Sequence, residues 1–384
     1  MEFIKYPINE FVIKVASRCN LDCDYCYEYN TGDNTWKSMP KYFSLKTAET
    51  LTSRIKVHAQ NHKIDEVILS FHGGVPLLVG PDRLLNLSKI FRSIESDSLE
   101  VSLTMQTNGT LLNDDFIEII KDMEICIAIS IDGPKNVNDI HRLDHKGEST
   151  YSNTLAGLEL IKNKAPEYIT GILSVIDVSS DPLEVFDFIG SLGIRDVDFL
   201  LPHYNWVTLP PRPTVKWDGD SNSSHIIYGK WYMQIWNEWI KGKHKDIRIR
   251  FFENIIRQLC NKGGLFEVMN SDPVSLVTIA TNGDIEGVDT LKSTGAGVQK
   301  LGVNIFDNSL DEVLTNHHIV SRQNSTDSLC EKCNTCSNLS ACWGGYFPHR
   351  FDKEASFDNP SVYCDDLYWL IDEMKKTIIN GINP

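Results

Sequence analysis

Short apolar runs alternate with amphipathic segments along the first half of the chain. The runs are nearly continuous in apolar residues, which is typical of parallel strands covered on both faces; they span residues 11–17, 66–72, 100–107, 125–131, 169–176 and 196–202. In the segment 181–192 the apolar positions share one helical face, and Asp181 is a suitable N-cap, as is Asn113 for an earlier helix. Six strand–helix repeats predict an α/β fold with a parallel sheet, either doubly wound or an incomplete barrel.

The pattern changes near residue 203. Residues 203–224 are rich in Pro, Gly, Asp and Ser and predict a loop. A helical stretch with Trp231, Trp236 and Trp239 follows, and we expect these rings to pack in the core, with contact to a peptide as the other reading. Farther on, Asn282-Gly283 predicts a tight β-hairpin.

The charge balance and the length of the apolar runs argue against several classes of partner. The 384 residues include 37 Lys+Arg and 52 Asp+Glu, a formal net charge of −15. Such an acidic excess argues against a nucleic-acid partner bound through phosphates. The apolar runs are shorter than the roughly 18 residues that span a bilayer, and residues 1–16 do not have the pattern of a signal peptide. We therefore predict a cytoplasmic protein with neither a membrane nor a nucleic-acid partner.

The ten cysteines are clustered, which in a reducing compartment predicts metal ligands rather than disulfides. Three lie near the N-terminus and five near the C-terminus; Cys126 and Cys260 stand alone and are expected to be buried. Four histidines have no metal-ligand spacing to the cysteines and are expected at the surface: His58, His62, His317 and His318.

The first cluster is Cys19-x3-Cys23-x2-Cys26, directly after the first predicted strand. Three thiolates on one loop can hold three irons of a cubane and leave the fourth iron open, which makes a metal cluster reactive. Zinc with a fourth ligand elsewhere in the chain is the alternative.

With Tyr25 before its last cysteine, this loop resembles the signature of the radical SAM superfamily, C-x3-C-x-aromatic-C after strand one of a partial (βα)6 barrel. The resemblance implies a catalytic [4Fe–4S] cluster, S-adenosyl-L-methionine (SAM) with Tyr25 beside its adenine, and an electron donor such as flavodoxin or ferredoxin. Reduction then cleaves SAM to a 5′-deoxyadenosyl radical, which abstracts a hydrogen atom from the substrate.

Further matches to the superfamily follow the other strands. Gly73-Gly74-Val75-Pro76 resembles its GGEP segment, which contacts the SAM amino group, although Val75 replaces the glutamate. Arg142 lies in a motif that resembles one of the superfamily, and its guanidinium could pair with the SAM carboxylate. A surface arginine is the alternative. The resemblance also assigns cofactor contacts to strand-end residues: Gln106, Asn108, Ser130, Asp132 and Leu201.

The second cluster resembles the SPASM extension of radical SAM enzymes that modify peptides. Four cysteines match the ligands of its second auxiliary [4Fe–4S] cluster: Cys333, Cys336, Cys342 and Cys364. Those of the first are replaced by Val288 and Tyr346, so we expect one catalytic and one auxiliary cluster. Cys330 is either a free thiol or a substitute ligand, and a structural zinc is the alternative to the auxiliary cluster. The expected parts are a radical SAM partial barrel (8–205), a linker with a Trp-rich helical segment (206–265) and a SPASM-like domain with a C-terminal helix (266–384).

The stretch from Gly344-Gly345 to Phe357-Asp-Asn-Pro-Ser-Val-Tyr-Cys364 resembles maturases of the FxsB and darobactin type. That resemblance implies a ribosomally made precursor peptide in which an aromatic ring carbon is joined to a Cβ, forming a three-residue cyclophane. Asp289 occupies the position of the base in related sulfatase-maturing enzymes, and a solvent-exposed Asp is the alternative. The competing hypotheses are formylglycine formation in a sulfatase and a non-catalytic, peptide-binding relative.

Overall fold

The chain forms two compact units in the computed structural model, which describes residues 6–218, 224–269, 272–323 and 328–382. The N-terminal unit comprises Met1–Ile131, Asp139–Gly171 and Pro273–Asn324; the C-terminal unit comprises Asp132–Asn138, Ile172–Asp272 and Ser325–Pro384. The three-part division expected from the sequence stays a prediction. Part of its loop, residues 219–223, lies outside the described residues.

Seven strands of the N-terminal unit lie in the order β10-β9-β8-β1-β2-β3-β4. Their bounds are β1 Glu10–Ala16, β2 Glu66–Gly73, β3 Glu100–Thr107, β4 Ile125–Ser130, β8 Leu276–Ile279, β9 Asp284–Glu286 and β10 Lys300–Asn304. β1 to β4 and β8 run parallel, whereas β8, β9 and β10 form antiparallel pairs. The predicted hairpin at Asn282-Gly283 is confirmed, and Gly283 there has a φ of 89°.

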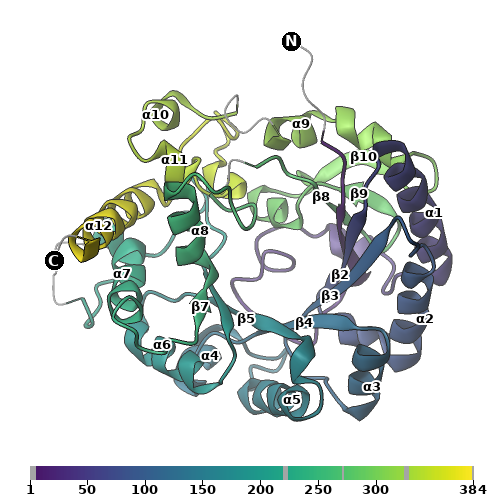
Figure 1. The fold of residues 1–384 in the computed structure, drawn as a ribbon, viewed down its shortest axis with the longest axis horizontal. Helices are drawn as coiled ribbons and strands as arrows, with labels where there is room; N and C mark the ends of the chain where they lie inside the picture. The colour runs from purple at the N-terminus through teal and green to yellow at the C-terminus, as the bar shows by residue number, and fades with distance from the viewer. Residues whose placement is uncertain (1–5, 219–223, 270–271, 324–327, 383–384) are drawn as a thin grey trace. The chain divides into compact units, whose positions relative to one another are not determined.

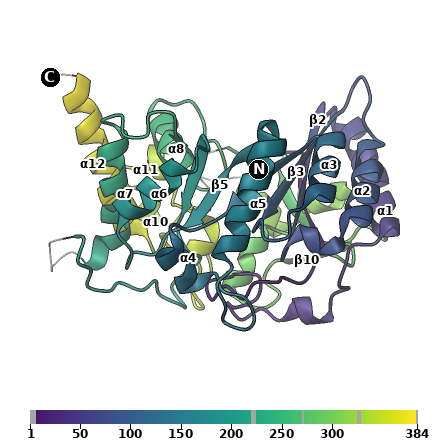
Figure 2. The same ribbon diagram turned by 90° about the horizontal axis from the view of Figure 1, so that it is seen from below.

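Helices of the N-terminal unit cover one face of its parallel strands, with α1, α2 and α3 side by side (Figures 1 and 2). The helices are α1 Leu45–His62, α2 Pro81–Arg92, α3 Asp114–Asp122, α5 Tyr151–Lys164 and α9 His317–Gln323, and the 3-10 turns are η1 Thr35–Ser38, η2 Pro76–Val79, η3 Pro166–Tyr168, η5 Asp289–Thr294 and η6 Leu310–Thr315. Asn113 caps α3 by accepting the Phe116 N–H, as predicted.

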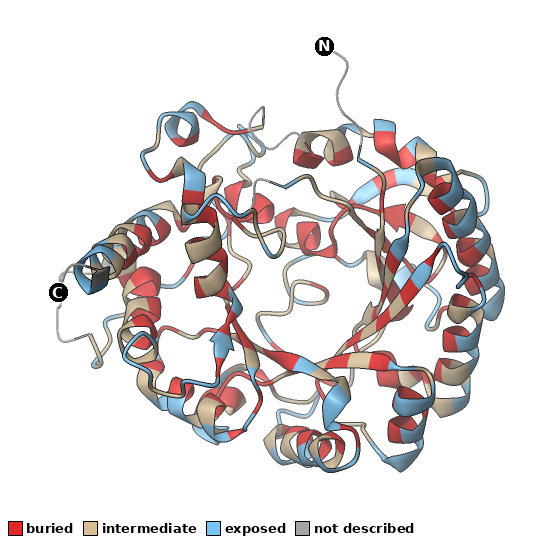
Figure 3. Cartoon of the chain, in the orientation of Figure 1, coloured by how far each residue is buried: buried red, intermediate tan, exposed pale blue. Residues whose placement is uncertain are grey.

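The prediction that the strands are covered on both faces is wrong for β2, β3 and β4. Their residues alternate between buried and half-buried. Figure 3 shows the buried positions of α1 to α3 on the side toward the strands. The second strand face is therefore only half-covered, and it carries polar side chains, among them His72, Gln106 and Ser130. Cys126 lies on this half-buried face.

The C-terminal unit contains the strand order β5-β6-β7, with neighbouring strands parallel. Its strands and helices are β6 Asp196–Leu200, β7 Arg248–Ile249, α6 Pro182–Ser191, α7 Ile227–Trp239, α8 Arg250–Leu259, α10 Glu331–Asn334, α11 Leu339–Cys342 and α12 Cys364–Ile382, with 3-10 turns η4 Ser224–Ile226 and η7 Phe347–Arg350. Strand β5 (Ile169–Val175) and helix α4 (Lys135–His141) contribute residues to both units.

Aromatic packing holds the C-terminal unit together. Trp231 and Trp236 of α7 are fully buried, which confirms their predicted place in the core. α7 packs against α12 (Figure 2), and a Cβ on Gly229 would lie 2.6 Å from the Asp366 carbonyl oxygen. Cys260, expected to be buried, is exposed because it lies at the end of α8.

The α/β fold with a parallel sheet is confirmed. Within the described part of the chain, no helix combines the length and the apolar character needed to cross a membrane.

Candidate functional site

The first cysteine cluster lies on the loop after β1, and backbone hydrogen bonds fix its shape. The Cys26 N–H donates to the Cys23 carbonyl at 3.0 Å, and the Leu21 N–H donates to Cys19 Sγ at 3.4 Å. Asn30 closes the loop by donating its side-chain amide to the Cys23 carbonyl at 2.8 Å. The three thiols therefore lie on one rigid loop in the N-terminal unit.

Of the three thiols, Cys23 is buried, and Cys19 and Cys26 are partly exposed. Burial raises the pKa of Cys26 to about 12, and neighbouring Cys23 adds to the shift; burial likewise raises the pKa of Cys19. A bound metal centre would stabilise the thiolate form of this loop.

The spacing of the sulfurs distinguishes a cluster from a single ion. Zn–S bonds of about 2.3 Å place the four sulfurs of a zinc site about 3.8 Å apart. Among the described residues no three cysteine sulfurs lie within 4.8 Å of one another. The three thiols of the loop and the four of the second set suit the all-cysteine ligation of an iron–sulfur cubane, which holds its ligand sulfurs farther apart than one zinc ion does.

The glycine pair after β2 packs against the cysteine loop itself. A Cβ on Gly73 would lie 2.1 Å from the Ala16 carbonyl oxygen, and one on Gly74 would lie 2.1 Å from that of Arg18. The N–H groups of Gly74 and Val75 donate to those same two carbonyls. Close backbone packing thus requires glycine here, and the Val75 side chain is fully buried.

Side chains at the ends of β3 and β4 form hydrogen bonds that reach the cysteine loop. Gln106 donates to the Ser130 hydroxyl at 2.7 Å. Asn108 donates to the Asn20 side chain at 2.9 Å, and Asn20 lies between Cys19 and Cys23. These predicted cofactor contacts therefore lie in the same unit as the cysteines.

Arg142 and Tyr25, which the resemblance assigns to two different parts of SAM, contact each other. The Arg142 guanidinium donates to the Tyr25 hydroxyl at 2.8 Å, and its charge lowers the pKa of Cys19 in part. The Thr150 hydroxyl of the same motif donates to the Arg142 carbonyl. A buried guanidinium beside the cluster loop suits the carboxylate of an amino-acid ligand such as SAM.

The two remaining predicted cofactor contacts lie in the C-terminal unit. Asp132 is buried and accepts the Val175 N–H at 3.0 Å, so its carboxylate also holds the end of β5. Leu201, just after β6, is buried.

Asp289, the predicted base, is the centre of a buried ion cluster in the N-terminal unit. Lys14 of β1 donates to Asp289 Oδ2 at 2.5 Å and to Glu28 Oε2 at 3.0 Å. The Tyr27 hydroxyl donates to the same Asp289 oxygen at 2.9 Å, and Lys292 donates to Glu28 at 2.5 Å. Within the described part of the chain, Asp289 Oδ1 accepts no hydrogen bond.

These contacts set the charges of the cluster. Burial alone would raise the pKa of Asp289, but Lys14 and His72 hold it well below its usual range. Burial, Lys14 and other neighbours lower the pKa of His72 to about 4, so its neutral ring accepts a hydrogen bond from Lys14 at Nδ1. Asp289 is therefore a buried carboxylate, not the solvent-exposed side chain of the alternative reading.

The second cysteine set lines a cavity of about 350 Å³ in the C-terminal unit. All four expected ligands reach this cavity, namely Cys333, Cys336, Cys342 and Cys364. Cys330 is not among its lining residues, but it packs with Leu329, Leu339 and Cys333, and its thiol is hydrogen bonded to that of Cys333. The four lining cysteines fit the all-cysteine ligation of an auxiliary cluster, and Cys330 lies close enough to Cys333 to stay the alternative ligand.

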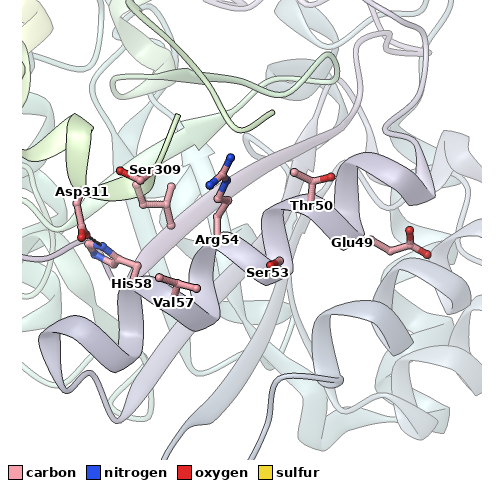
Figure 4. Close-up of a pocket in the computed structure, with 9 residues that line it drawn as sticks. Glu49, Thr50, Ser53, Arg54, Val57, His58, Ser309 and Asp311 are labelled. Carbon is pink, nitrogen blue, oxygen red and sulfur yellow. Dashed lines mark hydrogen bonds and ion pairs between the residues drawn. The ribbon is translucent and has the colours of Figure 1, made fainter. Parts of the chain in front are cut away.

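A second polar group of the N-terminal unit was missed because its residues are distant in sequence. His58, expected at the surface, is only 2% exposed, and its Nδ1 contacts Asp311, which also accepts from His62 Nε2 at 2.9 Å. Figure 4 shows His58 and Asp311 pointing toward each other beside a cavity of about 420 Å³. The Ile8 N–H donates to His58 Nε2, so Nδ1 carries the proton and is not available to a metal ion.

Lys14, Glu28 and Lys292 were also missed as site residues. A lysine inside the apolar run of the first strand was the available signal, because a buried charge requires a partner.

The region that holds the N-terminal cysteines is similar to a known protein family. Residues 13–189 match the sequence model of the radical SAM superfamily. The serine-type anaerobic sulfatase-maturating enzyme of Bacteroides thetaiotaomicron is 25% identical, over 98% of this chain and 94% of its own.

Two solved structures show the same fold. The structure of native anSMEcpe with bound AdoMet has a TM-score of 0.79 at 21% identity, over 97% of this chain and 99% of its own. Streptococcus suis SuiB bound to precursor peptide SuiA has a TM-score of 0.61 at 16% identity, over 94% of this chain and 76% of its own. Residues 13–189 are therefore similar to the radical SAM superfamily in sequence, and the chain shares its α/β fold with these two solved structures.

Proposed function

We propose that this chain is a radical SAM enzyme that oxidises a residue of a peptide, and that it joins an aromatic ring carbon to a Cβ in a ribosomally made precursor peptide. The observation that carries the proposal is the pairing, in one unit, of a three-cysteine loop with a buried carboxylate whose Oδ1 is free of hydrogen bonds within the described part of the chain. The named relatives include sulfatase-maturating enzymes and a protein solved with its precursor peptide, which supports a peptide substrate.

When bound, the [4Fe–4S] cluster and SAM supply a radical that removes one hydrogen atom from the peptide. The protein's own residues must then accept a proton. Asp289 is held as a carboxylate by Lys14, and Tyr27 orients it through the shared Oδ2. Its Oδ1 is the atom that would take the proton.

The depressed pKa of Asp289 favours a very acidic proton donor. A ring that has formed a new carbon–carbon bond and lost one electron is cationic and releases its ring proton readily. A carboxylate that stays charged can accept this proton, so the site suits bond formation to an aromatic ring.

The absence of cysteines for a second auxiliary cluster also supports crosslinking over formylglycine formation. Val288 and Tyr346 stand where a second auxiliary cluster would need cysteines, and both side chains are buried. One auxiliary cluster suits removal of a single electron from the peptide radical. Formylglycine formation remains the second candidate, because the sulfatase-maturating relative aligns over nearly the whole of both chains.

The product of the full-length, anaerobically reconstituted protein distinguishes these two reactions. The protein is incubated with SAM, dithionite and one of two peptide sets. Peptides of the first set carry an aromatic residue two positions from a polar residue, and those of the second set carry the serine or cysteine of a sulfatase active-site segment. We expect loss of two hydrogens with a residue-to-residue bond in the first set, read by tandem mass spectrometry. An aldehyde in the second set alone would overturn the crosslinking proposal.

Asp289→Asn tests the base. We expect product formation to fall by about 10²–10⁴-fold while reductive SAM cleavage continues, because proton acceptance is lost and the radical is still formed. Asp97→Asn, at an exposed carboxylate, is the matched control and should leave both rates unchanged. Full product formation by Asp289→Asn would contradict the assigned role.

A further inference from the structure

Arg350 is a buried cation that holds the turn after Cys342. It ends η7 in the C-terminal unit and is only 6% exposed. Its Nε donates to the Gly344 carbonyl at 3.0 Å, and its Nη2 donates to the carbonyls of Trp343 at 2.8 Å and Gly345 at 3.4 Å. One guanidinium therefore binds the three consecutive carbonyls that follow a proposed cluster ligand.

The packing of this turn leaves little room for movement. A Cβ on Gly344 would lie 2.9 Å from Arg350 Cζ and 2.7 Å from Leu329. Gly344 and Gly345 have φ values of 75° and 71°, which favour glycine. The guanidinium thus packs directly against the backbone that carries Cys342.

The charge of Arg350 acts on the cysteines of the cavity. The guanidinium interacts electrostatically with the Cys333, Cys342 and Cys330 thiols, and more weakly with Glu267. A second cation, Lys332, also lines the cavity, but its side chain is 63% exposed.

We propose that Arg350 is a positioning and tuning residue for the auxiliary cluster, which fixes the Cys342 turn and raises the reduction potential of the cluster. The inference rests on the proposed function only for the presence of that cluster. Four thiolates give a [4Fe–4S] cluster a net negative charge, and each added electron increases it. A buried positive charge stabilises the reduced form more than an exposed one, because water screens the exposed charge.

The test measures a potential and needs no peptide. In a full-length background carrying Cys19→Ala, Cys23→Ala and Cys26→Ala, the only cluster expected is the auxiliary one. Its midpoint potential is read by an EPR-monitored titration with dithionite. We expect Arg350→Gln to lower the equilibrium constant for reduction at least tenfold, which is about 59 mV for one electron.

Lys332→Gln removes the same charge from the exposed side of the cavity and is the matched control. We expect a change of less than about threefold for this variant, because solvent screens its side chain. An unchanged potential in Arg350→Gln at full iron content, or equal shifts in the two variants, would overturn the proposal.

Arg350→Lys distinguishes the effect of the positive charge from that of the hydrogen bonds to the turn. It also provides the test if Arg350→Gln loses iron. Lysine keeps the charge but not the planar fork of donors. We expect a potential within about threefold of the background and an altered EPR line shape, because the turn loses hydrogen bonds. A tenfold drop in Arg350→Lys, or a background that binds no iron, would overturn the proposal. Failure of peptide crosslinking would leave this potential difference in place.

Discussion

The cysteine loop of the N-terminal unit and the cysteine cavity of the C-terminal unit both present thiol ligands, but they differ in the number of thiols and in the side chains around them. In the N-terminal unit three thiols share a loop with Tyr25, whose hydroxyl accepts from Arg142, a side chain suited to a polar cofactor. In the C-terminal unit four thiols line one cavity, and Arg350 is hydrogen bonded to the turn beside it. An incomplete ligand set leaves a reactive position, whereas a complete set stores or passes electrons.

The largest expected effect comes from removing one cysteine from each set. We predict that Cys23→Ala abolishes 5′-deoxyadenosine formation after reduction, because the open iron corner is lost, and that about four irons per chain remain. Cys336→Ala should lose the other irons and still cleave SAM. Iron analysis and chromatography of the nucleoside products check both, and continued cleavage by Cys23→Ala would refute the division of roles.

The ion cluster around Asp289 offers the next largest effect. Lys14→Met leaves two buried carboxylates, Asp289 and Glu28, without their shared cation. Breaking a buried ion pair costs about 3–5 kcal/mol, and we expect the free energy of unfolding from urea titration to fall by that amount. Lys332→Met, at an exposed position of the other unit, should change stability by about 0.5 kcal/mol or less. Equal shifts in the two variants would show that the buried pairs add nothing.

His72 predicts a pH dependence that belongs to the N-terminal unit. Its folded pKa of about 4 lies below the ordinary 6.5, and the groups facing it include Lys14, Asp289, Glu28 and Lys292. The unfolded chain therefore binds the proton first, so stability falls as pH drops from 6.5 toward 4. At about 1.4 kcal/mol per pKa unit the loss is on the order of 3 kcal/mol. Urea titrations across this range should show a smaller slope for His72→Gln, and an unchanged slope would exclude this residue as the cause.

The smallest predicted effect concerns the cofactor contact at Arg142. Arg142→Lys keeps the charge but loses the planar donor pair, so we expect SAM binding to weaken about tenfold. Tyr25→Phe, which removes only the hydroxyl that accepts from Arg142, should weaken binding less. Equilibrium dialysis with radiolabelled SAM measures both, and tighter binding by Arg142→Lys would contradict the assignment.

Local features were predictable from the sequence because their partners lie nearby. Asn113 and Asp181 cap the helices that follow them, as short side chains before amphipathic segments should. The strands β1 to β6 were placed to within two residues of their ends, whereas β7 was not predicted and no bounds were given for β8, β9 and β10. Alternating apolar and turn residues are sufficient for such elements.

Contacts between distant segments were not predictable. Lys14 meets Asp289 across 275 positions, and His58 meets Asp311 across 253. The predicted surface position of His58 was wrong, because helical spacing places it on the buried face of α1 with Leu51 and Ile55. The half-buried, polar face of β2, β3 and β4 was not predicted either. A run rich in apolar residues does not show which face of a strand a cofactor will cover.

The pairing of β1 with β8 has a consequence for biosynthesis. β1 pairs with β2 on one side and with β8, a segment near residue 276, on the other. A nascent chain that has not reached β8 would display an open hydrogen-bonding edge, and its Lys14 ammonium could pair only with Glu28, since Asp289 arrives with the same late segment. Ribosome-bound intermediates should therefore expose an aggregation-prone strand edge until the last third of translation.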